Sequence, residues 1–119
     1  MACGSSPLFV DGGGGGETPE ELETLLEDAL LLRDAHAAAG LFEAGSLLVT
    51  GEGSEYVRGR TAVLQVASRL CQNGSGYVAD PRRVLQTRDT ALLLGGSVIH
   101  VARRGPDGAW RFAISVFDI

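Results

Sequence analysis

The sequence contains no lysine, so arginine supplies all ten of its basic side chains. The arginines occur singly or in pairs, such as Arg82–Arg83 and Arg103–Arg104, and no aromatic residues alternate with them. The formal net charge is −5. Surfaces that bind nucleic acid combine clustered basic residues with a positive charge balance. We therefore expect no nucleic-acid partner.

Cysteine and histidine are also scarce. The two cysteines, Cys3 and Cys71, lie far apart in the sequence and form no Cys-x-x-Cys motif, and the two histidines, His36 and His100, are isolated. Structural metal sites and disulfide frameworks need such residues in closely spaced groups. We predict free thiols, no metal site and no cofactor.

Long hydrophobic runs are missing as well. No uncharged apolar segment reaches the ~20 residues that a helix needs to span a bilayer. The first ten residues have neither the basic stretch nor the apolar core of a signal peptide. We expect a cytoplasmic protein that does not contact a membrane.

The 119 residues, 45% hydrophobic and 21% charged, have the composition of one soluble globular domain. Residues 1–16 end in five consecutive glycines. A run of glycines loses much conformational entropy when it is ordered. We predict a disordered tail over residues 1–16 and a single domain over residues 17–119.

Three helices are expected in the first two thirds of the chain. Thr18 begins a capping box with proline at the first helical position, and the apolar residues that follow form one stripe with helical spacing (Leu22, Leu25, Leu26, Ala29 and Leu30). Asp34 can cap a short second helix over residues 35–42, and one continuous helix through Phe42 is the alternative. Apolar residues with helical spacing predict a third helix over residues 60–72.

The remaining segments predict strands. A short strand over residues 46–50 and a possible return over residues 55–57 are separated by a Gly-containing turn, and three long antiparallel strands are expected over residues 77–88, 91–104 and 109–117. Gly105 to Gly108 form a strong hairpin turn between the last two. This order indicates an α+β fold with the helices on one face of a curved sheet.

Both faces of that sheet are apolar in the sequence. Leu92, Leu93 and Leu94 are consecutive, and apolar or small residues occupy both sets of alternate positions from Trp110 to Phe117. A strand with one face in water should instead alternate with charged residues. One apolar face can receive the helices, and we expect a second copy of the chain to cover the other, giving a homodimer through the sheet.

The order of these elements resembles the nuclear-transport-factor-2-like superfamily, which includes ketosteroid isomerases and SnoaL-like polyketide cyclases. The resemblance covers about residues 18–119. Its motifs are Asp34 at the start of the second helix, Leu41-Phe42-Glu43-Ala44-Gly45-Ser46, the turn residues 52–55, Arg58-Gly59-Arg60, and Asp107-Gly108-Ala109-Trp110-Arg111 in the last hairpin.

The resemblance implies a cone-shaped α+β barrel in which N-terminal helices pack on a strongly curved, mainly antiparallel sheet around an apolar cavity. Such a cavity often binds a hydrophobic small molecule. A gapless match places Thr50 at the general-base aspartate of ketosteroid isomerase, and Leu26 at its oxyanion-hole tyrosine. Threonine cannot exchange a proton with substrate near neutral pH, so the typical isomerase base is missing.

Other residues are candidates for the site that the resemblance implies. His100 and Asp118 are the catalytic candidates, and the expected pocket residues are Leu26, Leu30, Phe42, Thr50, Tyr56, Leu64, Phe112 and Ser115. A core or dimer-face role is the alternative for His100, and a solvated chain end is the alternative for Asp118.

Three functions remain open at this point. The first is a small domain that binds a hydrophobic small molecule in an apolar cavity. The second is a SnoaL-like isomerase, cyclase or dehydratase that acts on a polyketide-like or steroid-like substrate by general acid/base catalysis. The third is an accessory domain that acts through a free sheet face.

Overall fold

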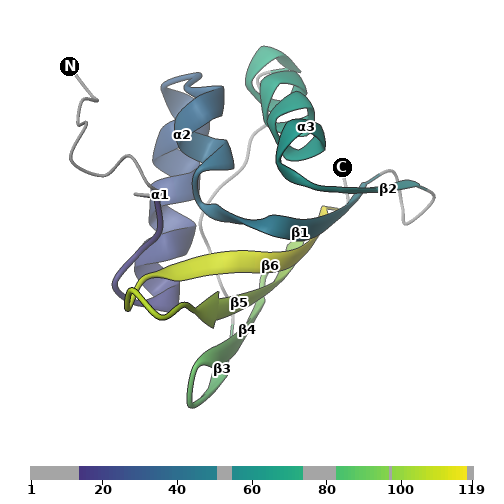
Figure 1. Cartoon of the computed structure of the whole chain (residues 1–119). Coiled ribbons are helices and arrows are strands. Elements are labelled where there is room, and N and C mark those ends of the chain that lie inside the picture. Colours follow the sequence, from purple (N-terminus) through teal and green to yellow (C-terminus); the bar gives the residue numbers. More distant parts are fainter. Residues whose placement is uncertain (1–13, 51–54, 74–82, 97, 118–119) are drawn as a thin grey trace.

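The computed structural model describes residues 14–50, 55–73, 83–96 and 98–117. Three helices lie on one side of a six-stranded sheet, in an α+β arrangement (Figure 1). Two helices come first in the chain, the third helix follows two strands, and the last four elements are all strands. The fold class predicted from the sequence is therefore confirmed.

The helices are α1 (Pro19–Leu31), α2 (Ala35–Ala39) and α3 (Arg60–Asn73). The N-cap predicted at Thr18 is present, because the backbone N–H of Glu21 donates to Thr18 Oγ1 over 3.0 Å. The Glu21 carboxylate in turn accepts from the backbone N–H of Glu17, one residue before the N-cap. Asp34 caps α2 in the same way through the N–H of Ala37. Both helices therefore begin where local side-chain acceptors satisfy their first free N–H groups.

The strands are β1 (Phe42–Thr50), β2 (Glu55–Arg58), β3 (Arg83–Thr87), β4 (Thr90–Leu94), β5 (Val98–Arg104) and β6 (Trp110–Phe117). Their order across the sheet is β2-β1-β6-β5-β4-β3. Only the β1–β6 pair is parallel among these described strands. The sheet does not close on itself, since β2 and β3 form its two edges.

One strand boundary corrects the sequence predictions. The predicted strand over residues 91–104 is a hairpin of β4 and β5, in which Leu94 pairs with Ile99 and the N–H of Gly95 donates to Val98 O over 2.9 Å. The two glycines at 95 and 96 have no side chain to pack, so they favour a turn over a continuous strand. Of the strand predicted over residues 77–88, Arg83–Thr87 forms β3, and residues 77–82 lie outside the described residues.

The predicted second helix is also too long. It ends at Ala39, and Phe42 begins β1 opposite Phe112 of β6. The pairing of these two residues places the centroids of their aromatic rings 5.1 Å apart in the core. Gly40, a poor helix former, is the C-cap of α2, and burial of the two rings against each other favours a strand at Phe42.

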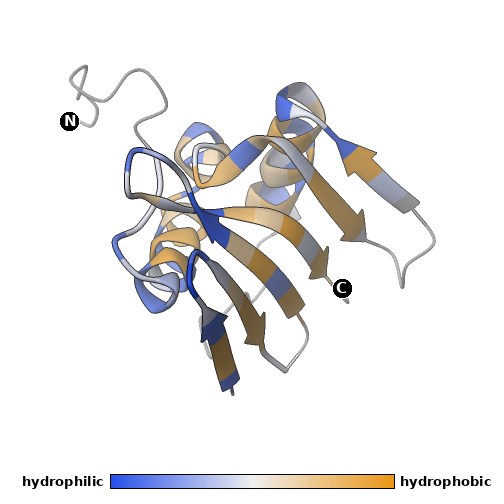
Figure 2. Cartoon of the chain, turned by 60° about the horizontal axis from the view of Figure 1, so that its bottom comes forward, coloured by the Kyte–Doolittle hydropathy of each residue, from blue (hydrophilic) through white to orange (hydrophobic). Residues whose placement is uncertain are grey.

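The inner face of the sheet and the facing sides of the helices form the core. Figure 2 shows hydrophobic residues in both the helices and the strands. Leu22 and Leu26 of α1, Val63 of α3, and Phe112 and Phe117 of β6 are all almost completely buried. The helical stripes predicted from apolar spacing therefore point into the interior.

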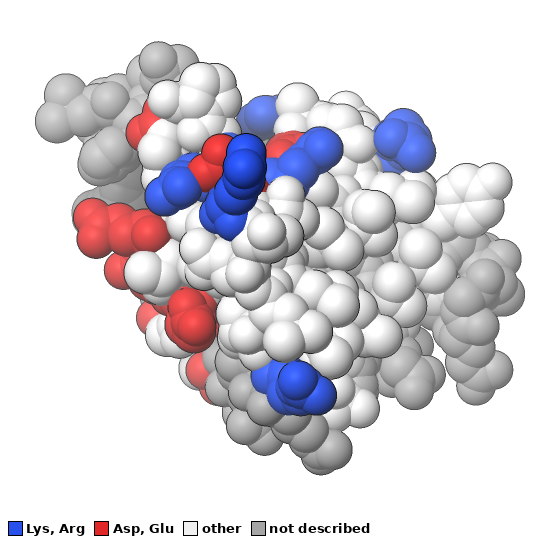
Figure 3. Space-filling view, turned by 90° about the horizontal axis from the view of Figure 1, so that it is seen from below, with Lys and Arg blue, Asp and Glu red and all other residues white. Residues whose placement is uncertain are grey.

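The outer face of the sheet is also apolar, as predicted. Strand register places ten large apolar or aromatic side chains on it (Leu47, Val49, Tyr56, Leu85, Leu92, Leu94, Ile99, Val101, Ile114 and Val116). Ile99 and Ile114 expose 44% and 39% of their surface. Figure 3 shows a broad area of this face without charged groups, most of which gather near one edge.

The last glycines of the predicted tail lie against the domain. Gly16 is buried and exchanges two backbone hydrogen bonds with Trp110 at the start of β6. A Cβ on Gly14 would lie 1.9 Å from the carbonyl oxygen of Gly40, so only glycine fits there. Residues 1–13 of the predicted tail lie outside the described residues.

None of the described helices combines the length and the apolar character that crossing a membrane requires.

Candidate functional site

A buried pair of polar side chains lies on the inner face of the sheet. His100 of β5 and Ser115 of β6 are register partners, and each has 0% of its surface exposed. Nδ1 of His100 lies 2.7 Å from Oγ of Ser115, which is a hydrogen bond. Because neighbouring positions on the same strand face alternately inward and outward, this register brings both groups to the helix side.

Aromatic rings enclose the imidazole of His100. Its centroid lies 4.1 Å from that of Phe112 and 5.6 Å from that of Phe117. The Phe112 ring is tilted over the imidazole, and the Phe117 ring meets it edge-on. The hydrogen-bonding pair is therefore surrounded by apolar surface, where a polar contact is stronger than in water.

A third polar side chain reaches the same place from the helix layer. Glu23 of α1 is 1% exposed, and its Oε2 lies 3.9 Å from Nε2 of His100. This separation is too long for a direct hydrogen bond. Because the site is buried, water screens any charge on the carboxyl group from the ring only weakly. We call Glu23, His100 and Ser115 the buried polar cluster.

Burial lowers the pKa of His100 from 6.5 to about 3. The physical cause is desolvation, because removing the ring from water disfavours its charged form. The imidazole is therefore neutral at physiological pH. A neutral imidazole has one N–H donor and one acceptor nitrogen, so it can form directed hydrogen bonds at both ends.

Sequence reasoning selected His100 and Ser115 but missed Glu23. The signal for Glu23 was present, because position 23 lies three residues before Leu26 and seven before Leu30 on the same helical stripe. A carboxylate on an apolar stripe is seldom buried without a polar neighbour. That neighbour is contributed by β5, far along the chain.

The predicted pocket residues do not all lie together. Leu26, Leu30, Phe42 and Phe112 belong to the buried core, and Leu64 and Thr50 are half-buried. Strand alternation places Thr50 on the same face of β1 as Leu48, which is in register with Ser115.

Tyr56 does not join this group, and Asp118 cannot be placed in it or outside it. Tyr56 lies on the outer face of the edge strand β2 and is 73% exposed. Tyr56 pairs with Val49, whose side chain points away from the helices. Asp118 lies outside the described residues.

A second buried serine provides a useful contrast. Ser46 of β1 is 1% exposed, and its Oγ has no hydrogen-bond partner within the part of the chain that the structure describes. Ser46 therefore contributes a buried hydroxyl without the compensating contact that Ser115 makes.

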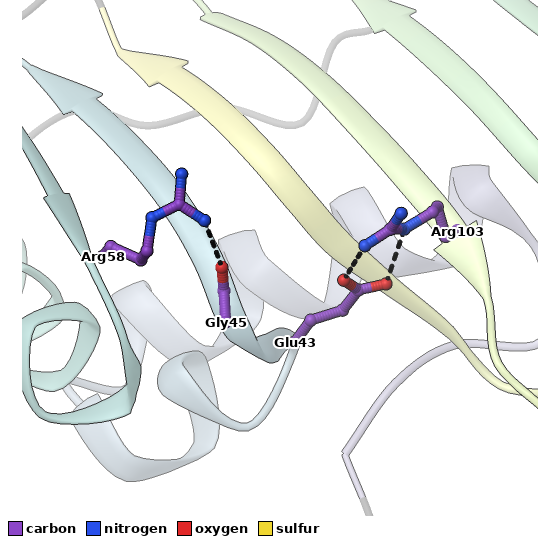
Figure 4. Close-up of polar contacts among 4 residues, drawn as sticks. All are labelled: Glu43, Gly45, Arg58 and Arg103. Carbon is purple, nitrogen blue, oxygen red and sulfur yellow. Dashed lines mark hydrogen bonds and ion pairs between the residues drawn. The ribbon is translucent and has the colours of Figure 1, made fainter.

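The outer face of the sheet carries its own polar contacts near one edge (Figure 4). Glu43 of β1 reaches across β6 and accepts two hydrogen bonds from Arg103 of β5, at 3.0 and 2.6 Å. Arg58 of β2 donates to the carbonyl oxygen of Gly45 over 3.4 Å. These groups lie on the opposite face from the buried polar cluster and form no part of it.

Among the described residues, no three His, Cys, Asp or Glu side chains are grouped in a way that could hold a metal ion.

No protein-family model matches the sequence, and the curated proteins contain no match to it. Solved structures do resemble this chain. A ketosteroid isomerase-like protein from Erwinia carotovora atroseptica superposes with a TM-score of 0.65 at 15% identity, covering 83% of this chain and 91% of that one.

Two further structures have the same architecture. A candidate dehydratase of the NTF2-like family from Streptomyces avermitilis gives a TM-score of 0.62 at 22% identity, over 82% of this chain and 90% of that one. An NTF2-like protein with a cystatin-like fold from Novosphingobium aromaticivorans gives a TM-score of 0.61 at 19% identity, over 84% of this chain and 78% of that one. The chain therefore has the nuclear-transport-factor-2-like fold.

Proposed function

We propose that this chain binds a hydrophobic small molecule between its helices and its sheet, with the buried polar cluster as the hydrogen-bonding anchor. The observation that carries the proposal is the fully buried His100–Ser115 pair, enclosed by Phe112 and Phe117. Ligand sites of this kind are mostly apolar and hold a few convergent polar groups that orient the ligand.

The pKa of His100 favours binding over catalysis. A general base works best when its pKa lies near the operating pH, and burial lowers the pKa of His100 to about 3. A base that weak accepts a proton from a substrate only at a large energetic cost. The neutral ring is suited to accept or donate a hydrogen bond without transferring the proton.

Binding can be tested with two ligands that differ in one donor, 2-naphthol and 2-methoxynaphthalene, by isothermal titration calorimetry. We expect the wild type to bind 2-naphthol, and Ser115→Ala to weaken binding roughly tenfold, the effect of losing about 1.4 kcal/mol of hydrogen bonding. Ser46→Ala is the matched control and should leave the affinity unchanged.

Native mass spectrometry of the freshly purified protein provides a second test. A co-purified mass typical of a lipid-like or polyketide-like compound would support the proposal and name the natural ligand class. Absence of any bound compound, together with no measurable binding of either naphthalene probe, would contradict it.

A second candidate function is acid–base catalysis on the same kind of ligand. The observation that favours it is the buried carboxyl of Glu23, 3.9 Å from Nε2 of His100, which places a second proton-carrying group beside the ring. Exchange of the α-protons of 2-tetralone in D₂O, followed by NMR, tests this candidate. Catalysed exchange that is lost in both Glu23→Gln and His100→Gln would support the enzyme over the binding protein.

We also propose a homodimer through the outer face of the sheet. A second copy would present the same ten apolar side chains, so an isologous contact covers both apolar patches at once. The charged groups near one edge of this face (Figure 3) suit the rim of such an interface, where charged side chains stay in contact with water.

A further inference from the structure

We propose that Glu23 is a positioning residue that holds His100 in the tautomer protonated at Nε2. In that tautomer Nδ1 accepts a hydrogen bond from the hydroxyl of Ser115. The Ser115 oxygen can then only accept a further hydrogen bond, so the ligand has to bring a donor, such as a hydroxyl or an N–H group. The ligand class in this inference rests on the proposed function, but the tautomer does not.

The position of Glu23 is the first step. Its Oε2 lies 3.9 Å from Nε2 of His100, and both side chains are buried. A nitrogen lone pair that faces a carboxylate oxygen is repelled, whereas an N–H that faces it is attracted. Because screening is weak in a buried site, this difference decides which nitrogen carries the proton.

The short contact with Ser115 is the second step. Nδ1 of His100 and Oγ of Ser115 are 2.7 Å apart, so one hydrogen must lie between them. If Nε2 carries the ring proton, that hydrogen belongs to the hydroxyl of Ser115. A hydroxyl has a single hydrogen and two lone pairs, so Oγ keeps only acceptor capacity for any other partner.

The inference selects one class of ligand among the hydrophobic molecules already proposed. An alcohol, a phenol or an amine can donate to Oγ of Ser115. An ether, or a ketone without a donor, offers only acceptors and would face the lone pairs of Oγ. The same reasoning gives a role to Glu23, whose carboxyl group is buried on an apolar helix stripe.

The tautomer can be measured directly by long-range ¹H–¹⁵N NMR on uniformly labelled full-length protein. The variant His36→Gln removes the only other histidine, which is exposed on α2, and leaves the His100 ring as the single source of signals. We expect a pyrrole-type ¹⁵N shift for Nε2 and a pyridine-type shift for Nδ1. The reverse pattern would overturn the proposal.

Three variants in the same background identify which residue sets the tautomer. Glu23→Leu should reverse or mix the two shift types, while Glu20→Leu, which removes an exposed glutamate from the same helix, should leave them unchanged. Ser115→Ala should keep the proton on Nε2. Reversal in Ser115→Ala, or no change in a folded Glu23→Leu, would show that Glu23 does not position the ring. If Glu23→Leu fails to fold, the spectra of the parent and of Ser115→Ala still show which nitrogen carries the proton and whether Ser115 determines it.

No ligand is added in this measurement. A wrong tautomer therefore counts against the role of Glu23 alone, and a failure to bind the naphthalene probes counts against the proposed function alone.

Discussion

Nδ1 of His100 and Oγ of Ser115 lie 2.7 Å apart, directly across the β5–β6 ladder, and neither side chain is exposed. This contact joins two polar groups in an interior that is otherwise largely apolar. Burial without a partner would cost each group part of its hydration energy. The hydrogen bond is thus both a structural feature of the core and the basis of the proposed binding site.

Loss of the Ser115 hydroxyl should destabilise the protein. Ser115→Ala leaves Nδ1 of His100 buried without this partner, so we expect the free energy of unfolding to fall by about 1–3 kcal/mol. Ser46→Ala removes a buried hydroxyl that has no partner among the described residues. We expect this variant to lose less than about 0.5 kcal/mol of unfolding free energy, or to become more stable. Urea denaturation at neutral pH measures both. Equal losses in the two variants would contradict this prediction.

Acid should destabilise the fold through His100. Burial lowers its pKa from 6.5 to about 3, so between these values the unfolded chain binds a proton that the folded chain does not. Stability contributed by the neutral ring is complete above pH 6.5 and decreases as the pH falls below it, by up to about 1.4 kcal/mol per pH unit.

Unfolding curves at several pH values between 7 and 4 test this sign. His100→Gln should flatten the dependence, whereas His36→Gln on the exposed face of α2 should not. A wild-type protein whose stability falls no faster with acid than that of His100→Gln would show that His100 is already protonated in the folded state.

The outer sheet face should control the oligomeric state. We expect a dimer by light scattering at micromolar protein concentration, and a monomer for Ile114→Asp, which puts a charge among the apolar side chains of this face. Leu31→Asp is a suitable control, because Leu31 is 71% exposed at the end of α1, on the helix side. A monomeric wild type would contradict the homodimer proposal.

The ion pair between Glu43 and Arg103 should contribute little to stability. The two side chains are 26% and 58% exposed, so water and salt screen their attraction despite the bidentate contact. A double-mutant cycle with Glu43→Gln and Arg103→Gln should give a coupling energy below about 1 kcal/mol at low salt, and less at high salt. A larger, salt-independent value would mean that the pair is buried, for instance by a second subunit.

Local features in the sequence determined much of this fold. Thr18 and Asp34 marked the starts of two helices, because a cap needs only residues three positions away. The turn from Gly105 to Gly108 likewise predicted the last hairpin, which β5 and β6 form. The turn at Gly95–Gly96 between β4 and β5 was not predicted, because the apolar residues on both sides of it suggested one continuous strand.

Only the tertiary structure decided which polar groups meet. His100 and Ser115 were each candidates, but their contact depends on the β5–β6 register, and a shift of one residue would turn either side chain to the outer face. Glu23 joins them from a helix 77 positions earlier in the chain than His100. Sequence patterns report short-range preferences of the backbone, whereas this cluster arises from packing α1 against the sheet, which depends on the whole core.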